Sequence, residues 1–433
     1  MNNELRKISE FALDALKKQG ADGAEVTLSK GRTDELNVDA GEFSLMRTTF
    51  NSSLSIRALV GGRKGTATYN SLDDDTVEKA VAAAISSAKS SEVDDAEYIA
   101  ENIGEHSFEF GAGDCELDKL YDRIGEYMET VKSEYPLVDI MQLVTQYQVS
   151  EDYYANSNGT RISSKDAAYV FDVGFSARDG DKTSSMSGYG FLTENLDKSF
   201  MENAEMRRMH REMEKQLDTV SVQGKFVGKL LVSPDCLSSF ISSVFGNCVS
   251  DGSLIAGDSP WKDKLGEVVA DPRLSITLDP LNPEIIGRAR YTSDGHIVEK
   301  QDIIKDGELV GFRLAQYGAK KTGLKRAGNY SGCYIMAPGD KSYDELLAGI
   351  GDGLLINRFS GGSPSTNGDF SGVAKNSFLI KDGKVTDAVS ETMISGNLLD
   401  MLKSVVGISR ELITDGSKVL PWIVFDGVTI SGK

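Results

Sequence analysis

The segment from residue 354 to residue 397 constrains the fold more than any other part of the sequence. It begins with an apolar run, passes through a glycine-rich stretch at residues 358–363, and ends with two runs of β-forming residues around Asp382-Gly383. An Asp-Gly pair between such runs predicts a two-residue β-hairpin. Paired glycines leave backbone amides and carbonyls unshielded by side chains. We therefore expect a strand, a glycine loop that can dock against another backbone, and a hairpin that braces this loop.

The chain has 433 residues, which is too long for one ordinary hydrophobic core, so two domains are expected. Glycine and polar residues at Gln223-Gly224-Lys225 are typical of a linker and indicate the boundary. The sequence predicts an α+β fold. Its N-terminal domain, residues 1–222, would pack helices on antiparallel meanders, and its C-terminal domain, residues 223–433, would be rich in β-strands.

Helices and short strands alternate in the first half. Apolar residues recur at helical spacing in residues 5–16 and 77–88, and short β-type runs lie between them at 24–28, 35–38, 43–46 and 53–60. A similar succession begins near residue 117. Gly159 follows Gly41 by 118 residues, and Gly180 follows Gly62 by the same interval. These matches favour a duplication of a helix–meander–helix unit, with chance coincidence as the alternative.

The second half opens with a strand and a helix that begins at Pro234, with a buried face predicted for Leu237, Phe240, Ile241, Val244, Phe245 and Cys248. Beyond it, Asp-Gly pairs at residues 294, 306, 382 and 426 each separate short segments of β character. A helix is expected near residues 344–347.

Charge and cysteine content exclude several classes of function. The balance of 47 Lys and Arg against 66 Asp and Glu gives a net charge of −19, which opposes binding to nucleic acid or anionic membranes. The four cysteines show no CxxC motif and are expected to be reduced thiols, as in the cytoplasm. No long apolar window and no signal sequence is visible, so we expect a soluble cytoplasmic protein.

Motifs for metal or nucleophilic chemistry are weak. His210 and Glu214 lie one helical turn apart and could share an ion, but their charged neighbours favour a solvated helix face. A catalytic Ser–Lys pair, for example Ser363 with Lys375, remains an alternative. A serine in such a loop, however, usually stabilises a turn through hydrogen bonds to the backbone. The glycines at Gly61-Gly62 lack a GK[ST] ending and predict a hairpin turn rather than a phosphate loop.

The order of short motifs along most of the chain resembles the TldD/PmbA family, the so-called modulators of DNA gyrase. The motifs that carry this resemblance are Ala21-Asp22-Gly23-Ala24-Glu25-Val26, Asn156-Ser157-Asn158-Gly159, Val232-Ser233-Pro234, Gly266-Glu267-Val268-Val269, Lys321-Thr322-Gly323, the loop from Ser360 to Phe370, and Ile394-Ser395-Gly396-Asn397.

The resemblance implies a zinc peptidase fold whose zinc ligands are missing here. Catalytic members carry His-Glu-x-x-x-His on the helix that opens the second domain and a cysteine near the C-terminus. Here those positions correspond to Ser242, Ser243, Asn247 and Ile413. A zinc peptidase needs imidazole or thiolate ligands for the metal and a carboxylate that takes the proton from the zinc-bound water. None of these four residues supplies such a group. Positions 242 and 247 are also about 140° out of line on an ideal helix, so joint ligation would need a distorted turn.

The resemblance therefore points to the PmbA or TldE side of the family. It implies no catalytic residue and no cofactor in this chain, with zinc in a TldD-like partner subunit, and extended peptides as substrates. The expected peptide-binding residues are Arg358, Ser360, Gly361, Gly362, Ser363 and Asn367, which would take the peptide as an added strand. A homodimer is a further option when the partner is absent. The alternatives are an autonomous hydrolase with an unrecognised site and a non-enzymatic interaction protein.

Overall fold

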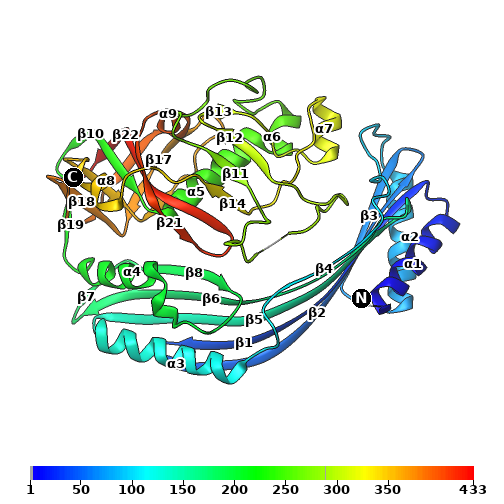
Figure 1. The fold of residues 1–433 in the computed structure, drawn as a ribbon, viewed down its shortest axis with the longest axis horizontal. Coiled ribbons are helices and arrows are strands. Elements are labelled where there is room, and N and C mark those ends of the chain that lie inside the picture. Colours follow the sequence, from blue (N-terminus) through cyan, green and yellow to red (C-terminus); the bar gives the residue numbers. More distant parts are fainter. Residues whose placement is uncertain (1–2, 288) are drawn as a thin grey trace.

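Two β-sheets organise the molecule, a computed structural model that describes residues 3–287 and 289–433 (Figure 1). Within those residues, the first sheet has eight strands and the second has fourteen. The first sheet forms a long arch, and the body built on the second sheet sits inside its curve. The predicted α+β fold, with a β-rich C-terminal part, is confirmed.

The first sheet has the strand order β3-β2-β1-β5-β6-β4, and β7 and β8 also pair with β6. The bounds are β1 Gly23–Asp39, β2 Glu42–Val60, β3 Arg63–Tyr69, β4 Glu105–Gly111, β5 Val138–Asn156, β6 Arg161–Asp179, β7 Lys182–Thr183 and β8 Ser187–Thr193. The predicted short strands were wrong, because residues 24–38 lie in one strand and residues 43–60 in another. Gly31 and Asp34 stay extended since β1 pairs with both β2 and β5 over nearly its whole length.

The predicted repeat is present in the order of the elements. The first unit is α1 (Asn3–Lys18), β1, β2, β3 and α2 (Asp74–Ser90), and the second is α3 (Leu117–Glu134), β5, β6, β7 with β8, and α4 (Ala204–Lys215). Both β2 and β6 contain 19 residues. The matched glycines have positive φ at corresponding turns, 79° at Gly41 and 108° at Gly159. Because β1 and β5 pair antiparallel at the centre, an approximate two-fold axis relates the two units.

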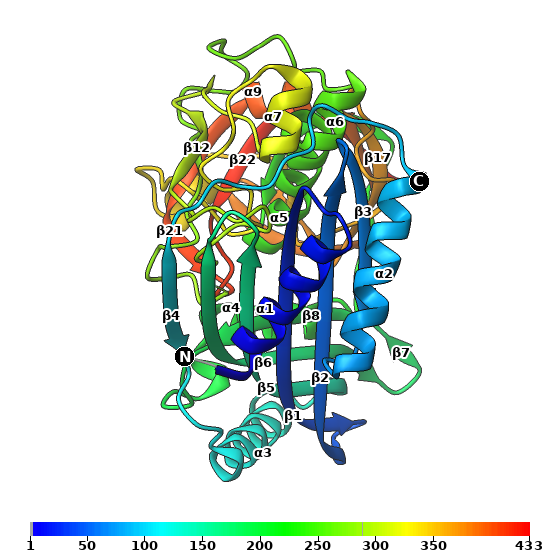
Figure 2. The same cartoon turned by 90° about the vertical axis from the view of Figure 1, so that its right-hand side faces the viewer.

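Helices cover the two ends of the arch separately. At one end α1 and α2 pack on β1 and β2, as Figure 2 shows from that side. Leu16, Val81 and Ile56 belong to one buried cluster there. At the other end α3 and α4 pack on β5 and β6 around the buried rings of Tyr127 and Phe171. Between these two ends, no helix of the described residues covers this face of the first sheet.

The second sheet has the order β13-β12-β11-β14-β22-β10-β15-β18-β19-β9, with β16, β17, β20 and β21 joined beside this path. The bounds are β9 Thr219–Ser221, β10 Lys225–Val232, β11 Ile276–Leu278, β12 Gln301–Lys305, β13 Glu308–Leu309, β14 Tyr334–Met336, β15 Gly353–Ile356, β16 Arg358–Gly361, β17 Asp369–Lys375, β18 Ser377–Lys381, β19 Lys384–Ser390, β20 Met393–Asn397, β21 Val405–Thr414 and β22 Lys418–Ser431. β9 already pairs with β19 in this sheet, although the predicted boundary assigned residues 219–221 to the first domain.

The Asp-Gly pairs behave in two ways. Asp382 and Gly383 both have positive φ, 48° and 68°, and close the β18–β19 hairpin as predicted. The prediction was wrong for Asp426-Gly427, because these residues lie inside the continuous strand β22. The β10–β22 register shifts at this point, so the pair forms a β-bulge.

The remaining helices belong to the inner body or connect to it. They are the 3-10 turn η1 (Phe200–Glu202), α5 (Pro234–Val244), the π-helical turn η2 (Phe245–Val249), α6 (Asp251–Ala256), α7 (Gln316–Thr322), α8 (Tyr343–Ala348) and α9 (Leu398–Lys403). The helix expected near residue 344 is thus confirmed as α8. Over residues 3–287 and 289–433, no helix has the length and apolar character needed to cross a membrane.

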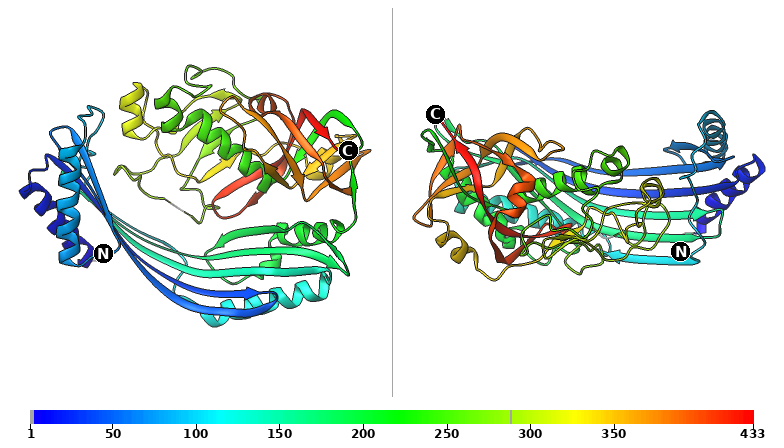
Figure 3. Two further views of the ribbon diagram at one scale, coloured as in Figure 1. Left: turned by 180° about the vertical axis from the view of Figure 1, so that it is seen from behind. Right: turned by 90° about the horizontal axis from the view of Figure 1, so that it is seen from above.

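The arch holds the inner body at both ends (Figure 3). On the α4 side, Arg208 and Glu212 both hydrogen-bond the side chain of Asn357. On the α2 side, the Tyr98 hydroxyl lies 2.8 Å from Nε2 of His296. These contacts fix the concave face of the first sheet opposite the second body.

Candidate functional site

The helix that begins at Pro234 carries the positions at which the family resemblance places zinc ligands. Ser233 caps it by accepting a hydrogen bond from the amide of Cys236, and Pro234 stands where no amide donor is required. The apolar face predicted for this helix is buried in the largest core cluster. α5 then continues as the π-helical turn η2. In a π turn, hydrogen bonds join residues five apart, so the distorted turn required between positions 242 and 247 is present.

The polar groups at these positions are already bound within the protein. Ser242 Oγ donates to the carbonyl of Ser238 at 2.8 Å, and Ser243 Oγ donates to the carbonyl of Ser239 at 3.2 Å. Such back-bonding to the preceding helical turn is common for serine. Asn247 Nδ2 reaches across to the glycine-rich loop and donates to the carbonyls of Pro364 and Ser365, each at 3.1 Å.

These residues do not fit a zinc ion. Serine hydroxyls and a carboxamide are not the imidazole and thiolate donors that zinc prefers, and Ile413, in β21, has no donor atom at all. Ile413 instead lines a small pocket with Pro234 and Ser238. In the part of the chain that the structure describes, no group of three or more His, Cys, Asp and Glu residues is arranged to hold a metal.

Gly246 lies between Ser243 and Asn247 in this turn. A Cβ atom added there would meet nothing within 4 Å, and the backbone does not have positive φ. Gly246 therefore has room for a side chain.

The glycine-rich stretch is partly an edge strand. β16 runs antiparallel to β17, and among the described strands it pairs with no other. Its outer side is therefore an edge to which a further strand could be added, although the backbone of Phe359 there already hydrogen-bonds the thiol of Cys236 on α5. The brace expected from the β18–β19 hairpin was wrong, because β18 pairs with β15 and the stretch is held by β17 instead.

The two glycines of this stretch have different roles. Gly361 has a φ of 136°, and a Cβ there would stand 2.9 Å from Cα of Gly372 on β17. Gly372 in turn lies against the Phe359 ring, 2.6 Å from the position of an added Cβ. Gly362 is exposed, and its Cβ would meet only the Ser371 carbonyl at 3.7 Å. Gly361 is required by the fold, whereas Gly362 has room for a side chain.

Polar residues fix the loop that follows. Ser365 Oγ donates to Asn367 Oδ1 at 2.5 Å, and Asn367 Nδ2 donates to Asp369 Oδ2 at 2.9 Å. Asn397 Nδ2 donates to the Asn367 carbonyl and to Asp369 Oδ1, each at 2.9 Å. With Asn247 on the other side, the loop is held from two elements. The side chain of Asn367, expected to bind peptide, is used to hold its own loop.

The other predicted peptide-binding residues are separated by the structure. Arg358 Nη1 donates to the carbonyl of Met186 at 2.7 Å, so its side chain joins the inner body to the arch. Ser360 is half-buried and its backbone pairs with Val373, while Ser363 is exposed. Lys375 pairs with Arg358 at the end of the β16–β17 ladder remote from Ser363, which does not support a Ser–Lys pair.

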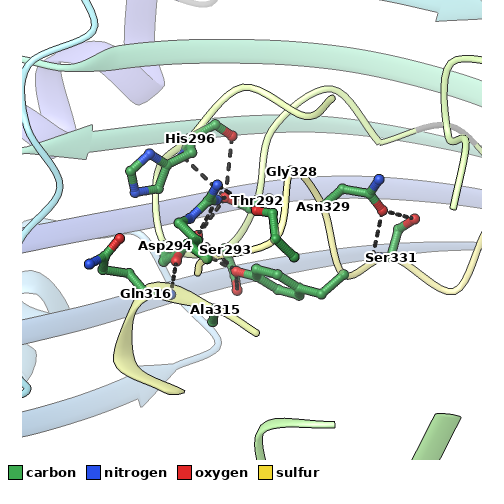
Figure 4. A network of polar contacts seen from close by, with 12 residues as sticks. Thr292, Ser293, Asp294, His296, Ala315, Gln316, Gly328, Asn329 and Ser331 are labelled. Carbon is green, nitrogen blue, oxygen red and sulfur yellow. Dashed lines mark hydrogen bonds and ion pairs between the residues drawn. The ribbon is translucent and has the colours of Figure 1, made fainter. Parts of the chain in front are cut away.

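A polar network around Asp294 was missed by the sequence reasoning (Figure 4). Thr292, Tyr330 and Arg326 donate to Asp294 Oδ1 at 2.5, 2.9 and 3.2 Å, and the amide of Gln316 donates to Oδ2 at 3.0 Å. Burial by itself would raise the pKa of Asp294, but these hydrogen bonds outweigh it and lower the pKa to about 2. Three of the donors lie 22–36 residues away in sequence, so no local pattern indicates the network.

Next to this network, the ring of His296 is directed away from Asp294 toward the arch. Its Nε2 lies 2.8 Å from the Tyr98 hydroxyl, and burial lowers the pKa of His296. The Asp294 network thus holds the turn that presents His296 to Tyr98 in the connection between α2 and β4, and its geometry indicates a structural role.

The solvated helix face predicted for His210 was wrong. The side chain is fully buried, with Nδ1 donating to the Met206 carbonyl at 2.7 Å and Nε2 accepting from the Tyr127 hydroxyl at 2.9 Å. Burial lowers the pKa of His210 to about 4. This histidine is a core residue whose two ring nitrogens both have hydrogen-bond partners within the protein.

Family models match both parts of the chain. The model described as the PmbA/TldA metallopeptidase C-terminal domain matches residues 225–432, and the PmbA/TldA metallopeptidase domain 1 matches residues 24–88. Together they span more than half of the sequence.

Individual relatives match along nearly the whole chain. The chain is 27% identical to Metalloprotease PmbA of Escherichia coli O157:H7, over 96% of this chain and 95% of that protein. It is 26% identical to a Metalloprotease PmbA homolog of Haemophilus influenzae, over 99% and 96% of the two chains.

Solved structures share the fold. The crystal structure of TldE from Thermococcus kodakarensis superposes with a TM-score of 0.86 at 20% identity and covers 99% of this chain and 100% of its own. A candidate modulator of DNA gyrase from Bacteroides thetaiotaomicron superposes with a TM-score of 0.83 at 25% identity and covers 100% of both chains.

Proposed function

The chain belongs to the PmbA/TldD metallopeptidase family, and we propose that it is a subunit that binds peptide for a peptidase without holding the catalytic zinc itself. The zinc would belong to a second chain of the same family that carries His-Glu-x-x-x-His. This chain would contact the peptide substrate and bind it along an exposed strand edge. Its partner would hydrolyse the peptide bond.

One observation carries this proposal. Asn247 stands at a position where a catalytic relative would carry a histidine, and its amide is bound to the carbonyls of Pro364 and Ser365. A side chain that donates to two carbonyls presents no lone pair to a metal at that nitrogen. The residue that would bind zinc therefore fastens the loop next to the open strand β16.

The open edge of β16 supports an extended peptide as the ligand. A peptide added there would bond through its own backbone, so affinity would depend little on its side chains. Only chains that are unfolded or locally extended expose such a backbone. Substrates would accordingly be unfolded or extended segments of many sequences, and the net charge of −19 argues against nucleic acid as a ligand.

A cytoplasmic site of action is part of the proposal. All four cysteines, Cys115, Cys236, Cys248 and Cys333, are free thiols. Unpaired thiols are the usual state in a reducing compartment.

The test uses the chain alone and mixed with a zinc-bearing family member, with zinc measured by elemental analysis and cleavage of an unfolded peptide as the readout. We expect no stoichiometric zinc and no cleavage by this chain alone, and cleavage by the mixture. Replacement of the partner's motif glutamate by glutamine should abolish all cleavage. Residual cleavage in that mixture, or zinc bound by this chain alone, would show that this chain has a catalytic site.

A further inference from the structure

The arch and the inner body have separate hydrophobic cores. Among the described residues, the buried apolar clusters of the arch and the side chains packed on them end at Leu217, and those of the inner body begin at Val222. No such cluster joins the two bodies, so polar contacts hold one against the other. Bodies joined in this way are expected to move relative to each other.

The α4 end of the arch is attached to the inner body in several ways. The chain runs from α4 directly into β9, and β9 pairs with β19 of the inner body. The guanidinium of Arg208, on α4, lies 4.7 Å from the centroid of the Trp422 ring. The amide of Leu192, in β8, donates to the Asp415 carbonyl at 2.9 Å. Separation at this end would break backbone pairing as well as side-chain contacts.

The opposite end of the arch meets the inner body through side chains. Within the described residues, no backbone-to-backbone hydrogen bond joins residues 3–111 to residues 225–433. Instead, Lys321 Nζ lies 2.8 Å from Asp94 Oδ2, and the Tyr317 hydroxyl donates to the same oxygen at 2.9 Å. The side chains of Lys321 and Asp94 are 35% and 25% exposed, so ions in the solvent can screen this pair.

Segments of opposite charge meet at this end. Residues 92–101 of the arch contain five carboxylates and no Lys or Arg, and residues 320–326 of the inner body contain four basic residues and no Asp or Glu. Lys320 Nζ lies 4.7 Å from the centroid of the Tyr98 ring, and the Tyr98 hydroxyl contacts His296. Attraction between charges therefore contributes to this contact, whereas apolar burial does not.

Each side of the contact is held in place by its own body. Asp94 Oδ1 accepts from the Ala96 amide at 3.0 Å, so Oδ2 is left to meet the inner body. On the other side, the amide of Gln316, the first residue of α7, donates to Asp294 Oδ2 at 3.0 Å. Neither surface needs the other to keep its shape, so the contact can break and form again as a unit.

We call this contact the ionic latch and define it by Asp94, Tyr98, Tyr317, Lys320 and Lys321. We propose that the ionic latch opens and closes reversibly while the α4 end stays attached, and that an extended peptide enters between the two bodies when it is open. Because charges help to hold the latch, the open fraction should rise with ionic strength.

The role in peptide entry rests on the proposed function. Arg358, at the start of β16, donates to the Met186 carbonyl of the arch, so the proposed docking edge begins where the two bodies meet. Entry from the side needs no free chain end. Internal segments of longer chains are therefore substrates as well as chain termini.

The first experiment measures distances between two spin labels on the full chain. Val93→Cys with Ile255→Cys reports on the latch end, because Val93 is exposed on the arch and Ile255 is exposed on α6, which packs against α7. Met186→Cys with Met393→Cys, both exposed, reports on the α4 end. Both pairs are made in a Cys115→Ser background, since the other three cysteines are buried.

A rise in salt from about 0.1 M to about 1 M shortens the screening length from about 10 Å to about 3 Å, and it should increase the fraction of long distances at the latch end several-fold. Lys321→Glu, which brings two carboxylates together, should give mostly long distances at low salt. Lys325→Glu is the matched control, because Lys325 forms no ion pair among the described residues and its loss should leave the latch closed.

The label pair at the α4 end should keep its distance in every sample. A latch-end distance that responds neither to salt nor to Lys321→Glu would overturn the proposal, and so would a lengthening at both ends. These measurements need no peptidase partner and no peptide, so they test the latch even where the proposed function fails.

The second experiment closes the latch covalently. A bismaleimide with a reducible linker joins Asp94→Cys to Lys321→Cys in the Cys115→Ser background, and the product is then mixed with a zinc-bearing family member. Cleavage of an unfolded peptide should be lost and should return when a phosphine reduces the linker. Without the cross-link, a backbone-cyclised peptide of the same sequence should be cleaved as well as the linear one. Cleavage that the cross-link leaves unchanged, or failure of the cyclic peptide alone, would overturn entry through the latch.

Discussion

Asn247 and Ser365 are 118 residues apart in the sequence and are joined by a hydrogen bond of 3.1 Å from the side-chain amide to the backbone carbonyl. A second bond from the same amide reaches the Pro364 carbonyl. The helix that opens the second body thus holds the loop that follows the open strand β16.

Replacement of Asn247 by alanine should release this loop. Two neutral hydrogen bonds at a half-buried site stabilise the fold by about 1–2 kcal/mol. Hydrogen exchange of the Ser365 amide, which donates to the Asp369 carbonyl, should become faster. Peptide cleavage by the complex with a zinc-bearing partner should fall. Ser243→Ala is the matched control, because that hydroxyl bonds only its own helix. Unchanged exchange in Asn247→Ala would show that the loop is held by other contacts.

The two adjacent glycines should respond differently to alanine. Gly361→Ala places a Cβ 2.9 Å from Gly372 at a φ of 136°, which should cost on the order of 1–3 kcal/mol of folding free energy. Gly362→Ala has space and should fold normally, yet reduce peptide processing because the side chain obstructs the docking edge. Thermal unfolding and peptide cleavage measure the two effects. Normal cleavage by a folded Gly362→Ala variant would show that peptide does not dock at this position.

Asp294 should contribute stability that is lost in acid. Its pKa in the folded protein is about 2, below its ordinary value of 3.8, so the unfolded chain binds the proton more readily. The contribution is fully present above pH 4 and disappears as the pH falls toward 2, and it amounts to about 2 kcal/mol. Denaturant unfolding of the wild type and of Asp294→Asn should differ at pH 6 and converge near pH 2. A difference that does not change with pH would contradict this account.

His210 should make the protein less stable in mild acid. Burial holds the pKa of His210 at about 4, below its ordinary 6.5, so the folded state keeps the ring neutral while the unfolded chain becomes charged. Stability is therefore lost as the pH falls from 6.5 to 4, by about 2 kcal/mol between pH 7 and pH 5. Urea unfolding at these two pH values should show this loss in the wild type, and His210→Gln should reduce it. An equal loss in the variant would assign the effect to other groups.

Local patterns predicted many elements correctly. The apolar stripes of α1, α2 and α5 and the β18–β19 hairpin at Asp382-Gly383 depend on residues within a few positions of each other. Spacing and turn chemistry are enough for such features. The need for a distorted turn near Asn247 follows from helix geometry applied to the two ligand positions that the family resemblance implies, and η2 supplies that turn.

Predictions failed where distant residues decide the outcome. Gly31 is extended because β1 is paired on both sides, and Asp426-Gly427 is a bulge because β22 continues past it. His210 has charged neighbours in sequence, yet its ring packs on Phe175 and Tyr127 from other elements. The partners of Asn247 and Asp294 likewise come from remote segments. Local sequence patterns identify these residues but do not predict their tertiary contacts.

The repeat within the arch leaves its two halves unequally held. In one half the chain supplies its own β4 to cover the edge, and in the other half no described strand covers residues 42–53 of β2. Hydrogen bonds on one side only hold those residues in the sheet, so this half of the arch should open locally more readily than the half that β4 closes.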